Sequence, residues 1–178
     1  MTDWELHLEK TSRTFALAIP LLDEPLRREV TLSYLLFRVA DTLEDASTWP
    51  ASLRSESLRT CAKLIRQGDG ADVQKQASRW LSHGVTAHAG YQALLEAFPE
   101  LLEDTRRLPA ASVARIEHHV LRTIERMDDF VRRADGDGTV VLRSKRDLEA
   151  YCYAVAGIVG ELLTDLFVLQ VPRLRNAT

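Results

Sequence analysis

The chain has 178 residues with a hydrophobic content of 46%, and it contains only 8 glycines and 6 prolines. This composition is typical of a folded domain with a buried core, and it argues against a disordered chain. A formal net charge of −3 offers no basic surface for nucleic acid. The two cysteines, Cys61 and Cys152, lack metal-ligand spacing, so we interpret both as reduced, buried thiols of a cytoplasmic protein.

The N-terminal part of the chain is predicted to be helical. Apolar residues recur at helical spacing over residues 4–19, and Asp23, Glu24 and Pro25 together indicate the start of a further helix. That helix is expected to end near Asp45, because the sequence Ser-Thr-Trp-Pro follows shortly after it. Its core-facing side carries Leu32, Leu35, Leu36, Val39 and Leu43.

The opposite side of the same helix carries a row of polar residues. Tyr34, Arg38, Asp41 and Asp45 follow one another at intervals of four, three and four, and Glu44 lies at the edge of this row. Carboxylates within one helical turn, beside an arginine, suit a divalent cation that bridges to a phosphate-bearing ligand. Mg²⁺ in particular takes few protein carboxylates and leaves its other positions to water and substrate. Spacing alone leaves an ordinary charged surface as an equal alternative.

Downstream of this helix, the pattern predicts helices over residues 52–66, 91–98 and 110–134, and a short helix that ends at Leu81. Residues 67–72 indicate a loop because of their two glycines, and residues 139–142 a brief extended segment. Ser144 with Asp147 is typical of a capping box that opens the last helix. We therefore predict one all-α domain over residues 1–178.

The longest apolar stretch is residues 150–171. Because it contains Glu161 and Asp165, it is better interpreted as a central, buried core helix than as a membrane span. The first ten residues are polar and of mixed charge, so no secretory leader is expected. These features predict a cytoplasmic protein and leave peripheral membrane contact open.

Three sequence blocks together resemble the squalene/phytoene synthase family, whose members are head-to-head prenyl diphosphate synthases. The blocks are SRTF at 12–15, DTLED at 41–45 in the form typical of squalene synthases, and YCYAVAGIVG at 151–160. They occur in the family's order and at about its spacing, and the resemblance extends over residues 10–167. It implies an isoprenoid-synthase-like helical bundle around a central cavity.

The resemblance also implies roles for particular residues. The metal ligands would be Asp41, Glu44 and Asp45, the catalytic residues Tyr34, Arg38 and Tyr151, and the substrate-binding residues Lys10, Ser12, Arg13, Phe15, Val155, Ile158 and Leu162.

The implied reaction is an Mg²⁺-dependent condensation of two prenyl diphosphates, with farnesyl diphosphate as the expected substrate, through a cyclopropylcarbinyl diphosphate. NADPH would be needed if the product is squalene; dehydrosqualene and phytoene are the alternatives. The family's second aspartate-rich motif, NxxRDxxED, does not occur in these 178 residues. We therefore expect the bundle to be incomplete at its C-terminal side, to be completed by a further C-terminal segment or a partner chain, and not to turn over substrate by itself.

Two alternative functions belong to other classes. A catalytically silent helical module, truncated or degenerate, that binds a prenyl diphosphate or a partner chain is the main alternative, because the second motif is missing. A carboxylate-bridged di-iron bundle is disfavoured, because such bundles need paired Glu-x-x-His motifs and the sequence has none.

Overall fold

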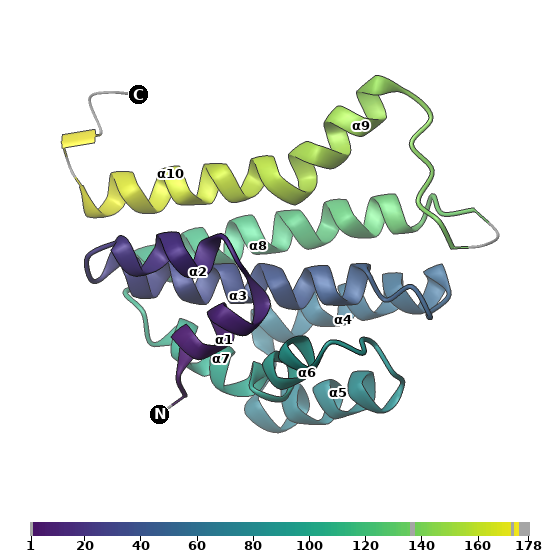
Figure 1. Cartoon of the computed structure of the whole chain (residues 1–178), viewed down its shortest axis with the longest axis horizontal. Coiled ribbons are helices and arrows are strands. Elements are labelled where there is room, and N and C mark those ends of the chain that lie inside the picture. Colours follow the sequence, from purple (N-terminus) through teal and green to yellow (C-terminus); the bar gives the residue numbers. More distant parts are fainter. Residues whose placement is uncertain (1, 136–137, 172, 175–178) are drawn as a thin grey trace.

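The computed structural model describes residues 2–135, 138–171 and 173–174, and these residues form helices without any strand. Figure 1 shows long helices that run side by side, with shorter helices packed below them. The predicted all-α fold is therefore confirmed. The helices and helical turns are α1 (Trp4–Thr11), α2 (Phe15–Ala18), η1 (Ile19–Leu21), α3 (Leu26–Glu44), α4 (Ala51–Gln67), α5 (Gly70–Ser82), α6 (Ala89–Glu96), α7 (Phe98–Arg106), α8 (Ala110–Val131), α9 (Lys145–Cys152), η2 (Tyr153–Gly157) and α10 (Ile158–Gln170).

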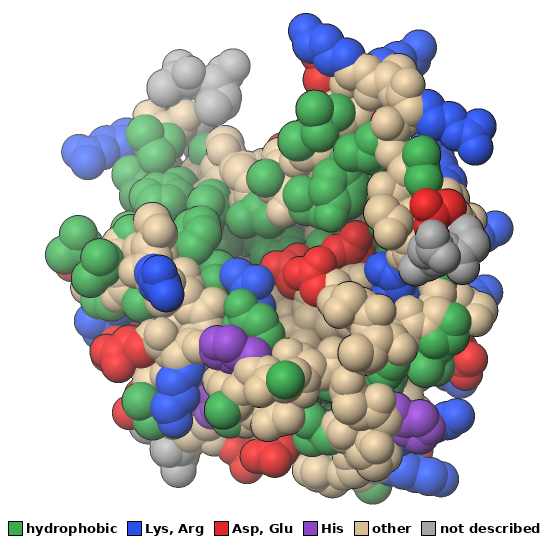
Figure 2. Space-filling view, turned by 45° about the vertical axis from the view of Figure 1, so that its right-hand side comes forward, with side chains coloured by type: hydrophobic (Ala, Val, Ile, Leu, Met, Phe, Trp, Pro, Cys, Tyr) green, Lys and Arg blue, Asp and Glu red, His purple; other side chains and the backbone are tan. Residues whose placement is uncertain are grey.

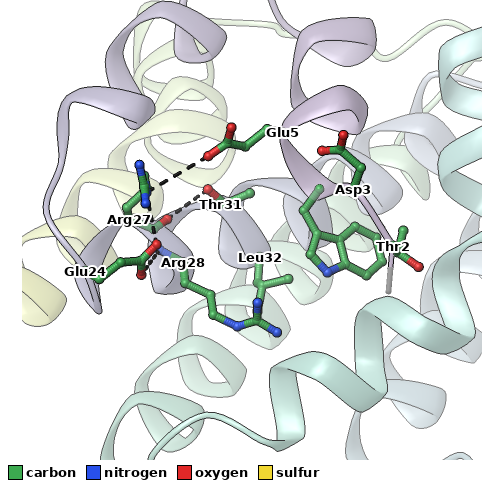
Figure 3. Close-up of a pocket in the computed structure, with 9 residues that line it drawn as sticks. Thr2, Asp3, Glu5, Glu24, Arg27, Arg28, Thr31 and Leu32 are labelled. Carbon is green, nitrogen blue, oxygen red and sulfur yellow. Dashed lines mark hydrogen bonds and ion pairs between the residues drawn. The ribbon is translucent and has the colours of Figure 1, made fainter.

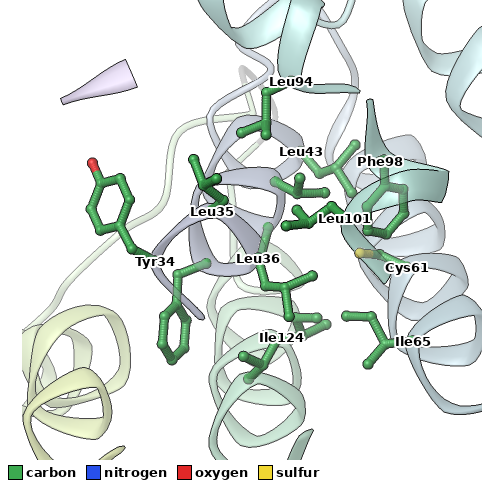
Figure 4. Close-up of a cluster of buried hydrophobic side chains, with 14 of the residues drawn as sticks. Tyr34, Leu35, Leu36, Leu43, Cys61, Ile65, Leu94, Phe98, Leu101 and Ile124 are labelled. Atoms are coloured by element: carbon green, nitrogen blue, oxygen red, sulfur yellow. The ribbon is translucent and has the colours of Figure 1, made fainter. Parts of the chain in front are cut away.

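Helix α3 occupies the centre of the molecule. It packs against α1, α4, α6, α7, α8 and α10. The five apolar residues of its predicted core face are all buried to 1% exposure or less. Figure 4 shows part of the cluster around them, in which Leu35, Leu36 and Leu43 lie near side chains of the neighbouring helices, while Tyr34 points to another side of α3. Removing one such leucine side chain would cost about 2–5 kcal/mol.

The N-terminal helix is interrupted where we expected it to continue to residue 19. Helix α1 ends at Thr11, and Ser12 is extended, with φ −148° and ψ 139°. The Ser12 hydroxyl accepts a hydrogen bond from the Phe15 amide (3.0 Å) and so begins the one-turn helix α2. Serine and threonine side chains compete with helical backbone bonds in this way, and apolar periodicity does not reveal it.

Several expected boundaries are close to those observed. The capping box before α9 is present, because the Ser144 hydroxyl accepts a hydrogen bond from the Asp147 amide (3.1 Å). The predicted loop at 67–72 is shorter, since α5 already begins at Gly70 with Asp69 as its N-cap. Residues 139–143 are irregular.

The prediction of a central, buried last helix was wrong. Helices α9 and α10, joined by the π-helical turn η2, lie along one side of the bundle (Figure 1). Only Ala154, Ile158, Leu162 and Leu166 are buried along this run. Val155, Val159, Leu163 and Phe167 are only partly buried against the core, and Leu148 and Tyr153 are exposed. Cys152 on α9 is exposed, contrary to expectation, whereas Cys61 is buried.

The run Lys145–Gln170 is also the one described helical segment that is long and apolar enough to cross a membrane, by length and composition only. In the structure, 22% of the most apolar 18-residue stretch of this run is buried. An apolar stretch that is only partly covered within the chain is open to contact with further protein or lipid.

Candidate functional site

The polar row on α3 forms a connected chain of contacts. Arg38 Nη2 donates a hydrogen bond to the Tyr34 hydroxyl (2.8 Å), and Arg38 Nη1 lies 3.4 Å from Asp41 Oδ2. Burial disfavours the charge on Arg38, but the Tyr34 hydroxyl and Asp41 outweigh this effect and raise the pKa of its guanidinium. Arg38 therefore remains a fixed cation beside the carboxylates.

Three carboxylates lie together at the C-terminal end of α3. Asp41 is half-buried, Glu44 is buried and Asp45 is exposed. Burial, together with the charge of Asp45, raises the pKa of Asp41 to about 6, although Arg38 opposes this rise. Burial and the neighbouring Asp45 raise the pKa of Glu44 to about 7. The protein alone therefore does not compensate the negative charge that these groups carry when they are ionised.

This set of oxygen donors fits a hard cation such as Mg²⁺. No group of three His, Cys, Asp or Glu side chains within the described residues is arranged to hold a metal by itself. That arrangement is compatible with Mg²⁺, which uses one or two carboxylates and completes its coordination with water and phosphate oxygens. Asp41 and Asp45, with Glu44 beside them, would hold the ion.

Tyr151 joins this site from α9. Its hydroxyl lies 3.3 Å from Glu44 Oε1, to which it donates a hydrogen bond, and its ring packs edge-to-face on Phe130 at 5.2 Å. Burial and the nearby carboxylates, Glu44 first, raise the pKa of the Tyr151 phenol well above its usual value. Tyr151 consequently stays protonated and acts as a hydrogen-bond donor toward the acidic end of α3.

The residues expected to bind diphosphate lie at the other end of the row. The Tyr34 hydroxyl is 3.4 Å from the Thr11 carbonyl oxygen, and the Phe15 ring packs on the Tyr34 ring at 4.9 Å. Lys10 and Arg13 are exposed and form no ion pair within the described part of the chain. The segment 10–15 thus flanks Tyr34 and carries two exposed cations.

The apolar residues of the last helix take two kinds of position. Ile158 and Leu162 are fully buried where α10 packs against α8 and α3, whereas Val155 is half-buried. Figure 2 shows a hollow walled by hydrophobic side chains, with carboxylates gathered at its floor and a cationic side chain beside them. The substrate-binding assignments of Val155, Ile158 and Leu162 stay predictions.

Two residues of the site escaped sequence reasoning. Tyr91 on α6 places its ring 5.3 Å from the Arg38 guanidinium carbon, and no motif marks it. Arg54 on α4 is buried, donates a hydrogen bond from Nη1 to the Glu44 carbonyl oxygen (3.0 Å) and also bonds the Gly138 carbonyl oxygen. Arg54 falls on the same helical stripe as the apolar residues of α4, which is the signal that could have revealed it.

A separate pocket lies away from this row. Figure 3 shows a hollow of about 310 Å³ between α1 and the start of α3, where Arg27 is paired with Glu24 (2.9 Å) and lies 4.0 Å from Glu5. It contains none of the predicted site residues. We therefore place the candidate site at the polar row of α3 and at Tyr151.

Comparison with known proteins shows the family of the chain. A sequence model of the squalene/phytoene synthase family matches residues 8–178. The chain belongs to this family. The squalene synthase of Candida albicans is 31% identical over 163 residues, which cover 91% of this chain and 34% of that protein. A protein named inactive squalene synthase 2, from Arabidopsis thaliana, is 26% identical over 166 residues and is covered to the same 34%.

The fold of the family is also shared. A solved complex of TcSQS with the ligand BPH1237 superimposes with a TM-score of 0.76 at 29% identity, over 94% of this chain and 44% of that one. The chain thus spans about a third of the length of the curated squalene synthases it matches. The family typically uses Mg²⁺ and binds prenyl diphosphates.

Proposed function

We propose that this chain binds a prenyl diphosphate through Mg²⁺ at the carboxylates of α3, as one side of a head-to-head condensation site. The observation that carries this proposal is the 3.3 Å contact between the Tyr151 hydroxyl and Glu44. It brings together two of the family's sequence blocks, which are 107 residues apart in the chain. A surface helix with an incidental charged face would not need this contact.

Each residue then has a distinct task. Asp41 and Asp45, assisted by Glu44, would hold Mg²⁺, which when bound offsets the charge of the diphosphate leaving group. Arg38, oriented by Tyr34, adds a fixed positive charge next to Asp41. Tyr151, which keeps its proton, donates a hydrogen bond at the floor of the site.

The remaining predicted residues bind and enclose the substrate. Lys10 and Arg13 would reach diphosphate oxygens from the α1–α2 segment, where Ser12 orients the backbone. Phe15 and Val155 would line the path of the prenyl chain and keep water from a reactive carbocation, while Ile158 and Leu162 would hold the wall behind it.

The reaction proposed for the complete site is the condensation of two prenyl diphosphates through a cyclopropylcarbinyl diphosphate. Farnesyl diphosphate is the expected substrate. NADPH would take part only if the product is squalene. A second set of carboxylates, from a C-terminal segment or from a partner chain, would complete the metal site.

The proposal is tested by titrating the chain with a non-hydrolysable farnesyl diphosphate analogue, with and without Mg²⁺. We expect binding to require Mg²⁺ and to weaken at least tenfold in Asp41→Asn, since a lost charge-assisted contact is worth about 1.5–3 kcal/mol. Asp72→Asn on the exposed start of α5 is the matched control. Equal affinity in the wild type and in Asp41→Asn would rule out the metal role.

A second candidate function is a silent binding module. It is favoured by one observation, namely that a relative which this chain covers to the same extent is named an inactive synthase. A silent module would bind the analogue in the same way. It would, however, form no product when a polypeptide carrying the second aspartate-rich motif is added.

A further inference from the structure

The Arg38 side chain lies close to two tyrosine rings. Its guanidinium carbon is 5.6 Å from the centroid of Tyr34 and 5.3 Å from the centroid of Tyr91. Tyr34 is on the same helix one turn earlier, but Tyr91 comes from α6. Both distances lie within the range over which the ring face attracts a cation, and partial burial of Arg38 strengthens that attraction.

The position of Tyr91 is set by contacts of its ring and of its backbone. His88, the N-cap of α6, stacks on Tyr91 at 4.1 Å and accepts a hydrogen bond from the Tyr91 amide at Nδ1 (3.4 Å). The start of α6 is also seated directly on α1, because a Cβ added at Gly90 would lie 2.5 Å from the Lys10 carbonyl oxygen. Tyr91 is therefore a fixed surface against which Arg38 rests.

This arrangement leaves the donors of Arg38 available. A guanidinium has five N–H groups at its edge, and a ring that packs on its face occupies none of them. Within the described residues, the Arg38 edge has only the Tyr34 hydroxyl and Asp41 as partners, and its buried Nε has no partner. A buried, unpartnered N–H is costly unless a ligand satisfies it.

We propose that Tyr91 is a positioning residue that holds the Arg38 guanidinium edge toward the diphosphate of the substrate. This inference rests on the proposed function, because the diphosphate is the oxygen-rich ligand that the free donors would meet beside Asp41. Tyr91 acts through Arg38 and fixes its orientation by packing on its face. Tyr34 fixes the same guanidinium with its hydroxyl.

The first test needs no ligand. In a ¹⁵N-labelled chain, the Arg38 Nε–H proton signal, assigned with Arg38→Gln, should carry the ring-current displacement caused by Tyr91. We expect Tyr91→Phe to keep this displacement and Tyr91→Leu to lose it. An unchanged Arg38 signal in Tyr91→Leu would overturn the inference, whatever the chain binds.

The second test measures binding of inorganic diphosphate with Mg²⁺. We expect affinity in Tyr91→Leu to fall roughly five- to tenfold, as a part-buried cation–π contact suggests, and to be kept in Tyr91→Phe. In an Arg38→Gln background, Tyr91→Leu should cause no further loss. Farnesol, which lacks the diphosphate, serves as the uncharged ligand whose affinity should not change.

The outcomes separate the two proposals. A Tyr91→Leu effect that persists in the Arg38→Gln background, or that is equally large for farnesol, would show a general packing role and overturn the inference. A wild-type chain that binds no diphosphate would overturn the proposed function and the ligand role of Arg38 with it. In that case the Arg38 signal would still show whether the ring orients the guanidinium.

Discussion

Replacing Glu44 with glutamine should stabilise the metal-free chain at alkaline pH. Glu44 is 5% exposed, and burial together with the neighbouring Asp45 raises its pKa from 4.5 to about 7. At about 1.4 kcal/mol per pH unit, ionising Glu44 in the folded chain costs up to about 3 kcal/mol relative to the unfolded chain. The Glu44→Gln side chain keeps an oxygen for the Tyr151 hydroxyl but carries no charge, so this cost disappears.

The direction of the pH effect follows from the raised pKa. A carboxyl group whose pKa is higher in the folded than in the unfolded state binds its proton more tightly when folded. Its contribution to stability is therefore full below about pH 4.5 and is lost as the pH rises through about 7. The wild-type chain should lose stability over this window, and Asp41, with a pKa of about 6, should add to the loss.

Urea unfolding at pH 5 and pH 8, with EDTA present, measures this effect. We expect the midpoint of Glu44→Gln at pH 8 to exceed that of the wild type by up to about 1.5 M, given a slope of about 2 kcal/mol per M. Adding Mg²⁺ at pH 8 should stabilise the wild type more than the variant, because the ion binds the ionised carboxylates. Glu56→Gln, on the exposed side of α4, is the control. Identical pH dependence in the wild type and in Glu44→Gln would refute the assignment of a charge conflict at this site.

Three further outcomes are expected. Gly90→Ala should destabilise the chain by roughly 1–3 kcal/mol in thermal unfolding, because its new Cβ meets the Lys10 carbonyl oxygen, whereas Gly160→Ala, with open space around it, should not. Cys152 should react readily with a thiol reagent in the native state, while Cys61, whose pKa burial raises to about 12, should react only on unfolding; mass spectrometry of the labelled chain checks this. The 178 residues alone, incubated with farnesyl diphosphate, Mg²⁺ and NADPH, should form no squalene or cyclopropyl precursor on extraction, because only one set of carboxylates offsets the leaving-group charge; steady product formation would contradict this.

Sequence reasoning succeeded where a local pattern determines the structure. The spacing of the leucines on α3 fixes its core face, and the same spacing places Tyr34, Arg38 and Asp41 in one contact row. The two inferences about α3 depend on helical periodicity, which is a property of the chain itself. The assignment of Tyr151 to the same site as the acidic end of α3 came from the family resemblance, and the two lie in contact in the structure.

Sequence reasoning failed where tertiary packing determines the position of a residue. Tyr91 reaches Arg38 only because Gly90 allows α6 to approach α1, and neither residue carries a motif. The last helix was expected to be buried because it is apolar, but burial depends on which elements surround it. Cys152 is exposed for the same reason.

The sequence interpretation gave the carboxylates Glu161 and Asp165 no place in the functional site, and the structure shows that both attach α10 to α8. Asp165 Oδ2 lies 2.9 Å from Nε2 of the buried His119, and Arg122 donates a hydrogen bond to Glu161 (2.7 Å). Few residues of α10 are buried, so its apolar contacts hold it on the bundle only in part. The polar contacts with α8 add to this attachment.

The same anchor extends to the π-helical turn. The Tyr153 hydroxyl bonds both Glu161 and Arg122, and its ring covers Gly157, where a Cβ would lie 2.5 Å from the ring. π-Helical turns are rare in proteins, and the wider turn rotates the residues before it relative to those after it, compared with a continuous α-helix. Holding this turn on α8 therefore sets the direction in which α9 leaves α10, and with it the position from which Tyr151 reaches Glu44.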